Sequence, residues 1–344
     1  MWVFTALLVT TLAAKPTTVE EFLAQPVEEH VEQLTGQAFV DYINEHQSFY
    51  RAKYSPEAEA FVASRVMDSK FRRKPRKEEV LSHVVRDEKL PESFDARQQW
   101  PKCKSIAIVR DQSACGSCWA VSSASAMSDE LCVQSGGAIN VVISDTDILS
   151  CCGEACGEGC EGGWPIEAYR WMKRDGVVTG GKYEEKNTCK PYAFYPCGKH
   201  KNAPYYGPCP RGSWPTPKCR KMCQRKYKNS YKEDKHFAKH SFYLPNNETS
   251  IRQEIFETGP VVAAFNVYED FRYYVGGIYV HKWGKQTGAH AVKVIGWGTE
   301  NGTDYWLVSN SWSSDWGEKG YFRIVRGINN CGIEEEMVAG LMKS

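Results

Sequence analysis

The chain has no cysteine before Cys103, although its 344 residues contain fourteen. Long apolar runs are missing as well: the N-terminal run, residues 1–14, is shorter than the roughly 20 residues that cross a bilayer. Neither charge sign dominates, with 43 Lys and Arg against 42 Asp and Glu, and internal repeats and low-complexity segments are absent. The sequence thus gives no sign of a membrane span, and its charge gives no reason to expect nucleic acid as a partner.

Residues 1–14 have the character of a secretory signal, because the apolar run ends in small residues, although no Lys or Arg precedes it. The cysteine content agrees with export, since disulfides persist where thiols are oxidised. Asn247 and Asn301 each begin an Asn-x-Thr sequence, so both are candidate glycosylation sites. We expect a precursor that enters the secretory pathway and a soluble mature protein.

Residues 15–89 differ from the rest of the chain because they lack cysteine, are rich in charge and contain helix-favouring runs such as residues 38–43. We interpret them as a removable pro-segment, with an approximate boundary, and residues 90–344 as the mature domain. The basic stretch Lys70–Lys77 is interpreted as an exposed linker.

In the expected mature domain, a helical part precedes a strand-rich part. The spacing of apolar residues predicts a helix over Ser117–Ser135. Between the two parts lies an insert rich in Cys, Pro and Lys, residues 186–239, whose cations favour a solvated face over an anion-binding surface. A later helix is expected to have Ser250 and Gln253 as its capping box. β-Branched and aromatic runs predict strands at residues 261–267, 290–295, 305–308 and 321–325.

The sharpest pattern is Gln-Ser-Ala-Cys-Gly-Ser-Cys-Trp at residues 112–119. Cys118 opens the predicted helix, where unpaired backbone N–H groups and the helix dipole stabilise a thiolate. The thiolate is the attacking form of cysteine, so this position suits a nucleophile in acyl transfer. Cys115 and Cys118 also form a C-x-x-C pair, but the βαβ setting of a redox motif is missing.

A thiolate needs an imidazolium partner that can protonate the leaving amine. Of the eight histidines, His290 lies at the start of a predicted strand, within Gly-Ala-His-Ala-Val. Asn310 follows at the end of the next strand, within Ser-Asn-Ser-Trp, and its amide oxygen can accept the imidazole N–H and fix the ring. A lone His or Asn is more often structural, but the order Cys, His, Asn, each in its own pattern, predicts a catalytic triad.

These motifs resemble those of the papain-like cysteine peptidases, cathepsin B-like subgroup, and the resemblance extends over about residues 90–342. It implies an α+β fold with a helical left domain, a β-rich right domain and the active-site cleft between them. It also implies hydrolysis of protein or peptide substrates through an acyl-enzyme, without cofactor or metal. The pro-segment would act as an inhibitor, and the mature enzyme would be a monomer.

The resemblance also assigns roles to residues of the cleft. Gln112 matches the glutamine whose side-chain amide helps form the oxyanion hole, and Trp312 matches the tryptophan that shields the His–Asn hydrogen bond. Gly162 and Gly163 match the strip that pairs with the substrate backbone. Glu336 matches an acidic residue at the base of the S2 pocket, which would admit Arg at P2. The apolar walls of this pocket correspond to Pro165, Ile166, Ala264 and Ala291.

The separation between Cys118 and His290 exceeds the roughly 130–150 residues usual for the family, and the excess falls in the insert. Cathepsin B carries its occluding loop there, which corresponds to residues 197–209. In cathepsin B two adjacent histidines of this loop receive the C-terminal carboxylate of the substrate, which makes the enzyme a dipeptidyl carboxypeptidase.

In this sequence Lys199 and His200 occupy the two histidine positions. The lysine would bind a carboxylate or pair with Asp111. The loop has no arginine to reach Asp315, the partner of the second loop contact in the family. We therefore expect a looser loop and mixed activity: dipeptidyl carboxypeptidase activity together with an endopeptidase activity stronger than that of an enzyme with two loop histidines and both loop contacts.

The resemblance pairs twelve cysteines and leaves Cys118 and Cys331 free. From the residues alone, a zinc site formed by Cys151, Cys152, Cys156 and Cys160 is the alternative, although no His accompanies this cluster. The implied disulfides are Cys103–Cys132, Cys115–Cys160, Cys151–Cys219, Cys152–Cys156, Cys189–Cys223 and Cys197–Cys209.

Two other functional classes remain as alternatives to a peptidase. A non-catalytic secreted binding homologue would usually have lost the nucleophile, and a disulfide oxidoreductase would need two reactive thiols. Residues 305–318 also resemble a pattern of gut cathepsin B-like enzymes from blood-feeding nematodes. The sequence does not decide between an extracellular destination, such as a gut lumen, and the lysosome.

Overall fold

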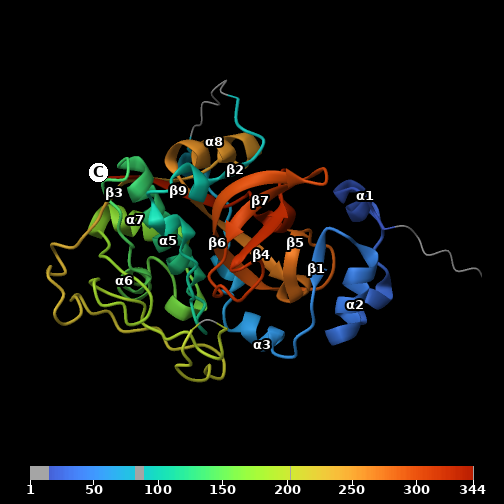
Figure 1. Ribbon diagram of the computed structural model, residues 1–344, viewed down its shortest axis with the longest axis horizontal. Coiled ribbons are helices and arrows are strands. Elements are labelled where there is room, and N and C mark those ends of the chain that lie inside the picture. The colour runs from blue at the N-terminus through green and yellow to red at the C-terminus, as the bar shows by residue number, and fades with distance from the viewer. Residues whose placement is uncertain (1–14, 82–88, 202, 344) are drawn as a thin grey trace, which may run out of the picture.

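The computed structural model describes residues 15–81, 89–201 and 203–343, so the predicted secretory signal lies outside the described residues. Two halves pack side by side in Figure 1, one built around helices and one around a twisted sheet. The predicted α+β arrangement of a helical half followed by a β-rich half is therefore confirmed. Among the described residues, no helix is long and apolar enough to cross a membrane.

The helical half is organised around α5 (Cys118–Gln134), which matches the helix predicted from apolar spacing. All of its residues from Cys118 to Cys132 are buried, because the helix lies between the sheet and the other helices. Two shorter helices pack beside it, α6 (Asp145–Cys151) and α7 (Pro165–Asp175). Pro165 suits the first turn of α7, whose N–H groups have no partner within the helix.

The β half contains a mixed sheet with the strand order β1-β5-β8-β7-β6-β4-β9-β3, in which β1 is Tyr50–Ala52, and β2 pairs with β6. All four predicted strand runs lie within observed strands, so these predictions are confirmed. Adjacent strands are antiparallel except β5 and β8, which run parallel. The strands of this half are β2 (Phe94–Asp95), β3 (Ala238–Tyr243), β4 (Val261–Tyr268), β5 (Tyr274–Tyr279), β6 (Gln286–Glu300), β7 (Thr303–Ser309), β8 (Tyr321–Val325) and β9 (Met337–Met342).

The capping prediction for the later helix is wrong. Helix α8 spans Glu248–Thr258, and its N-cap is Asn247, whose side chain accepts the backbone N–H of Ser250. Asparagine is as good an N-cap as serine, and here it comes first along the chain. Asn247 and Asn301 are both exposed, and their glycosylation stays a prediction.

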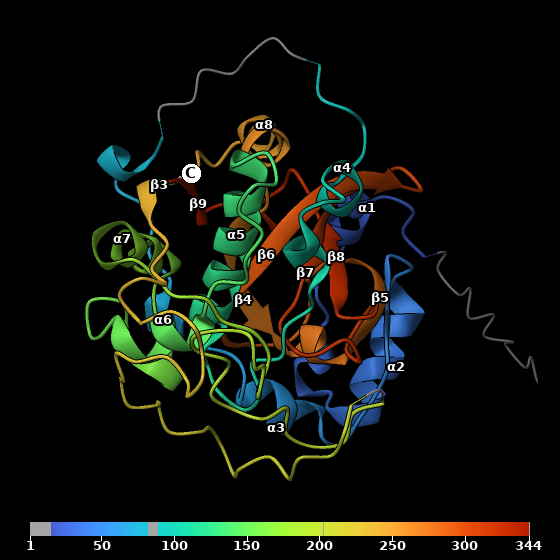
Figure 2. The ribbon, with the colours of Figure 1, turned by 60° about the vertical axis from the view of Figure 1, so that its left-hand side comes forward.

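Residues 15–81, called the N-terminal segment below, fold onto the rest of the chain, which we call the body. The segment contains α1 (Val19–Ala24), α2 (Gly36–His46), β1 (Tyr50–Ala52) and α3 (Ala58–Ala63), and a short helix α4 (Ala96–Gln99) follows in the body. Strand β1 pairs with β5 and becomes an edge strand of the body's sheet. Figures 1 and 2 show α1 and α2 beside this edge and the segment continuing through α3.

The interpretation of residues 70–77 as an exposed linker is wrong for residues 71–73. Phe71 is 1% exposed and stacks edge-on against Trp164 of the body. The side chain of Arg72 is 11% exposed because it enters a pocket of the body. Only from Lys74 onward does most of the stretch lie at the surface.

The insert has little regular structure and is held by disulfides. The structure contains the same six pairs that the family resemblance implies, and Cys118 and Cys331 are its free cysteines. The four cysteines of the alternative zinc site all belong to disulfides, so the zinc interpretation is wrong. The C-x-x-C redox interpretation fails for the same reason, since Cys115 pairs with Cys160.

Candidate active site

Cys118 is the first residue of α5 and lies at the junction of the two halves. The turn before it is fixed by the disulfide of Cys115 to Cys160 and by the hydrogen bond from the Gly116 N–H to the Cys160 carbonyl at 2.8 Å. A Cβ on Gly116 would lie 2.3 Å from that carbonyl oxygen, so the close approach requires glycine. The thiol is fully buried beneath the N-terminal segment and the start of β6.

Burial keeps both members of the candidate pair neutral in this form. It raises the pKa of the Cys118 thiol to about 12, although backbone N–H groups, including those of Ala291 and Met67, partly oppose the rise. Burial also lowers the pKa of His290 to about 4, with the hydrogen bond to Asn310 opposing this shift. At neutral pH the pair is therefore thiol and imidazole, because the charged forms would lose their hydration.

His290 lies in β6 and is held by Asn310, which follows the end of β7. The His290 Nε2 lies 2.7 Å from the Asn310 Oδ1. The same oxygen accepts the backbone N–H of Ser311 at 2.7 Å, and since an N–H can only donate, this contact fixes the orientation of the amide. Nε2 must then carry the proton, which leaves a lone pair on Nδ1, an atom without a hydrogen-bond partner among the described residues. Trp312, 1% exposed, covers this hydrogen bond with its ring 4.6 Å from the imidazole.

Every polar atom of Gln112 has a hydrogen-bond partner. Its side-chain Nε2 donates to the carbonyls of Arg65 at 2.8 Å and Cys115 at 2.7 Å, and its Oε1 accepts the Ser311 hydroxyl at 2.7 Å. Its backbone N–H donates to the Ser311 carbonyl at 2.9 Å, and its own carbonyl accepts the Tyr192 hydroxyl at 2.7 Å. The sequence interpretation gave no role to Ser311 or Tyr192, because neither contact follows from spacing.

The N-terminal segment crosses the junction between the halves at Arg65–Asp68. Met67 exchanges two backbone hydrogen bonds with Ala289, the residue before His290, at 2.8 and 2.9 Å. The Asp68 N–H donates to the Glu161 carbonyl of the helical half at 3.0 Å. A Cβ on Gly162 would lie 2.8 Å from the Cβ of Met67, so the glycine strip lets the segment approach closely. The next glycine, Gly163, lies against Trp119 in the same way.

Arg72 contacts two of the residues assigned to the predicted S2 pocket, Glu336 and Ala264. The Arg72 guanidinium forms an ion pair with Glu336, which is itself 5% exposed. It also donates to the carbonyls of Ala264 at 2.6 Å and Gly332 at 3.1 Å. Burial raises the pKa of the Glu336 carboxyl to about 7, and Arg72 opposes this rise. The apolar walls of the pocket are all buried: Pro165, Ile166, Ala264 and Ala291.

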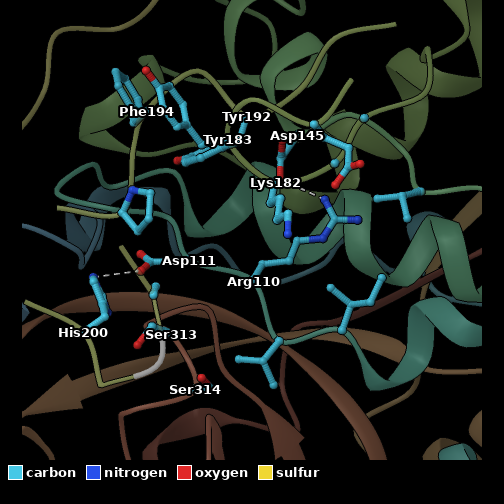
Figure 3. Close-up of a pocket in the computed structure, with 18 of the residues that line it drawn as sticks. Arg110, Asp111, Asp145, Lys182, Tyr183, Tyr192, Phe194, His200, Ser313 and Ser314 are labelled. Atoms are coloured by element: carbon cyan, nitrogen blue, oxygen red, sulfur yellow. Dashed lines mark hydrogen bonds and ion pairs between the residues drawn. The ribbon is translucent and has the colours of Figure 1, made fainter. Parts of the chain in front are cut away.

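The loop closed by Cys197 and Cys209 is fastened to the body by His200, and the expected pairing of Lys199 with Asp111 is wrong. His200 lies between two aspartates, with Nε2 3.6 Å from Asp111 and Nδ1 3.4 Å from Asp315. Figure 3 shows His200 beside Asp111 at the edge of a cavity of about 560 Å³.

The backbone N–H of Lys201 also donates to Asp315, at 2.9 Å. The loop therefore makes two contacts to Asp315 although it contains no arginine. It is thus attached to the body at Asp315. Lys199 is exposed.

The buried thiol predicts low reactivity in this form of the protein. At pH 7 a thiol with a pKa near 12 is almost entirely protonated, so we expect iodoacetamide to label Cys118 at least about 100-fold more slowly than an ordinary cysteine. Removal of residues 15–81 should accelerate labelling, because it returns water to the thiol and the imidazole. Peptide mass mapping of both forms measures this, with Cys118→Ala as the blank. Equal labelling rates before and after removal would contradict the assignment of the low reactivity to burial by the segment.

Comparison with known proteins shows the family to which the chain belongs. Residues 90–341 match the family model described as papain family cysteine protease. The chain is 47% identical over 312 residues to cathepsin B-like cysteine proteinase 5 of Caenorhabditis elegans, covering 90% of each chain. It is 47% identical over 320 residues to the gut-specific cysteine proteinase of the same organism, covering 91% of this chain and 92% of that one.

Among solved structures, proCathepsin B S9 from Trypanosoma congolense is similar with a TM-score of 0.75 and 35% identity. The match covers 91% of this chain and all of that chain, so it includes a pro-segment. The N-terminal segment therefore corresponds to a pro-segment folded onto its enzyme. On these grounds the chain belongs to the papain family of cysteine proteases, as a cathepsin B-like member in its proform.

Proposed function

We propose that the mature protein hydrolyses peptide bonds with Cys118 as nucleophile, His290 as proton carrier and Asn310 as the residue that orients the imidazole. The observation that carries this proposal is the carbonyl of Arg65. This carbonyl accepts the Gln112 side-chain amide at 2.8 Å. A peptide carbonyl thus already occupies the position where the oxygen of a substrate would receive this donor.

The residues of the candidate site account for each step of the proposed hydrolysis. Once the segment leaves, the Cys118 proton passes to Nδ1 of His290, and the thiolate attacks the substrate carbonyl. Gln112 and the Cys118 N–H stabilise the oxyanion as the C–N bond breaks, and the imidazolium donates its proton to the leaving amine. Water, deprotonated by His290, then hydrolyses the thioester, which restores the thiol and releases the acid.

The pro-segment would inhibit the enzyme by two effects. Residues 65–68 fill the cleft by backbone contacts to Gln112, Glu161 and Ala289, which excludes a substrate. Their burial of the thiol and the imidazole also disfavours the ion pair. We place the mature N-terminus near residue 90, next to the region 82–88 that lies outside the described residues.

The six disulfides support a route through the secretory pathway, because such pairs persist in oxidising compartments. The similarity to a gut-specific proteinase of C. elegans favours release into a digestive space over a lysosomal role.

For the oxyanion site, Gln112→Ala should lower kcat/KM by about 10²–10³-fold. Ser311→Ala should lower it by roughly 3–10-fold, because the amide loses the hydroxyl that fixes its orientation. Ser311→Thr keeps the hydroxyl and should restore most of the activity. Iodoacetamide labelling of Cys118 in the processed Ser311→Ala enzyme should not change, since that reaction needs no oxyanion donor. A parallel fall in labelling would instead indicate general damage to the site.

For the loop, we propose that His200 fastens it and that the exposed Lys199 receives a C-terminal carboxylate. Processed enzyme is given one peptide with a free C-terminus and its amidated twin, and the products are read by mass. Lys199→Ala should reduce dipeptide release roughly 10-fold and leave internal cleavage unchanged. His200→Ala should reduce dipeptide release and increase internal cleavage of both peptides, since it frees the loop.

Cys118→Ala is the control for this experiment and should cleave neither peptide. Dipeptide release that survives both loop substitutions would exclude this assignment. Internal cleavage reduced by His200→Ala would exclude the fastening role.

For the S2 pocket, Glu336→Gln should lower kcat/KM for a P2-Arg peptide roughly 10-fold and leave a P2-Phe peptide nearly unchanged. The wild-type preference for Arg should increase as the pH rises through the pKa of the Glu336 carboxyl, which burial raises in the proform, because the carboxyl is neutral below its pKa and anionic above it. The variant should lose this pH dependence. Equal losses for both peptides would show that Glu336 supports the pocket without selecting Arg.

A further inference from the structure

The N-terminal segment crosses the cleft from one side of the catalytic residues to the other. Arg72 lies at the predicted S2 pocket, and the carbonyl of Arg65 accepts the Gln112 amide. Earlier in the chain, Phe61 of α3 packs edge-on against Trp312, with the ring centres 6.0 Å apart. Helix α3 therefore covers the end of the cleft opposite the S2 pocket. Under the proposed function this end receives the substrate residues after the cleaved bond, P1′ onward, and we call it the primed side.

A cavity of about 990 Å³ lies on the primed side, where α3, the loop closed by Cys197 and Cys209, and the turn that enters β5 all contribute to its lining. The body supplies one lysine and two arginines to the described part of this lining, Lys199, Arg211 and Arg272. These three cations come from two parts of the body that are far apart in sequence, so the fold brings them around one cavity.

The acidic groups of the body do not neutralise these cations. Asp315 is the one body carboxylate in the described part of the lining, and it already contacts His200 and accepts the backbone N–H of Lys201. Lys199 and Arg211 are exposed, and neither has an ion-pair partner among the described residues. The body's side of the cavity is therefore basic.

Arg272 is the cation that the N-terminal segment already contacts. It lies in the 3-10 turn Glu269–Tyr273, and its side chain is only 11% exposed. Its Nη1 lies 3.5 Å from Oε2 of Glu59 in α3, and its Nη2 lies 3.7 Å from Glu269 of its own turn. Its Nε is buried and has no hydrogen-bond partner among the described residues. An acidic side chain of the segment thus shares this guanidinium with one of the body.

Loss of the segment removes Glu59 from Nη1 of Arg272. Glu269 remains, but it contacts the other terminal nitrogen. A guanidinium has five N–H donors, and leaving donors unpaired at a mostly buried site costs free energy. A carboxylate of a substrate can therefore take the place of Glu59 without displacing Glu269.

We infer that Arg272 is a specificity-determining residue of the primed side, which selects peptides with an acidic residue shortly after the cleaved bond. Lys199 and Arg211 add positive potential around the same cavity. The inference rests on the proposed peptidase function and adds the substrate class, which is polypeptides with Asp or Glu at one of the positions P1′ to P3′. It differs from the proposed capture of a C-terminal carboxylate by Lys199, because here an internal side chain is recognised.

The test uses processed enzyme and internally quenched peptides with Phe at P2 and an amidated C-terminus, so that no terminal carboxylate is present. One residue, at P1′, P2′ or P3′, is Glu, Gln or Lys, and all other positions stay the same. At pH 7 we expect kcat/KM of the best Glu peptide to exceed that of its Gln twin by roughly 3–10-fold, as for one partly buried ion pair, and the Lys peptide to fall below both. Added salt should reduce the difference by screening.

Arg272→Gln should remove most of the Glu advantage and leave the Gln peptide nearly unchanged, whereas Arg272→Lys should keep part of the advantage. Arg174→Gln, at an exposed arginine of α7, is the matched control and should keep all of it. Equal cleavage of the Glu and Gln peptides at all three positions would overturn the inference and leave the proposed function intact. The same holds for a Glu advantage that survives Arg272→Gln, or for an equal loss with both peptides. Absence of any Cys118-dependent cleavage would overturn both.

Discussion

The packing of α5 against β6 is the constraint on which the rest of the molecule depends. It brings Cys118, from the helical half, against the strand that carries His290. Farther along the helix, Asp129 pairs with Lys293 of the same strand at 2.6 Å, and both side chains are at most 2% exposed. Removing one partner of such a buried pair generally costs about 3–5 kcal/mol, because the other charge is left without compensation. The junction of the halves is therefore fixed independently of the catalytic residues, which need only project into it.

In the proposed mechanism, the same burial that assembles this junction keeps the site inactive in the proform. A dry environment favours the neutral thiol and the neutral imidazole, and the N-terminal segment lies over this site, where Met67 exchanges two backbone hydrogen bonds with Ala289. Activation then requires mainly a change of solvation: the pKa of Cys118 must fall and that of His290 must rise before a thiolate–imidazolium pair can form. The hydrogen bond to Asn310 already favours the charged imidazole, so this residue is prepared for the change before the segment leaves.

The sequence predicted those parts of the molecule that short patterns determine. Four strands of the β half, β4, β6, β7 and β8, follow from β-branched and aromatic runs, and the family resemblance assigned Cys118 and His290 from their flanking residues. Contacts over long separations were not predictable in this way. Arg72 was interpreted as part of a linker because a basic run is usually solvated, and its partner Glu336 lies in the last strand region of the chain. The direction of a loop side chain could not be predicted from the sequence either. His200, and not Lys199, lies beside Asp111.

The backbone of the pro-segment also suggests why it can occupy the cleft as an inhibitor without being a substrate. Gln112 donates to the carbonyl of Arg65, whereas the buried sulfur of Cys118 interacts with the backbone of Met67. The proposed oxyanion donor and the proposed nucleophile are thus directed at different peptide units, and attack on a carbonyl needs both at one unit. Because Met67 is held by its two hydrogen bonds to Ala289, the segment cannot slide to bring a single carbonyl to both groups without losing them. The resistance of the pro-segment to cleavage then follows from the register of its backbone in the cleft as well as from the neutral state of Cys118 and His290. The cations of residues 72–74 help to hold that register.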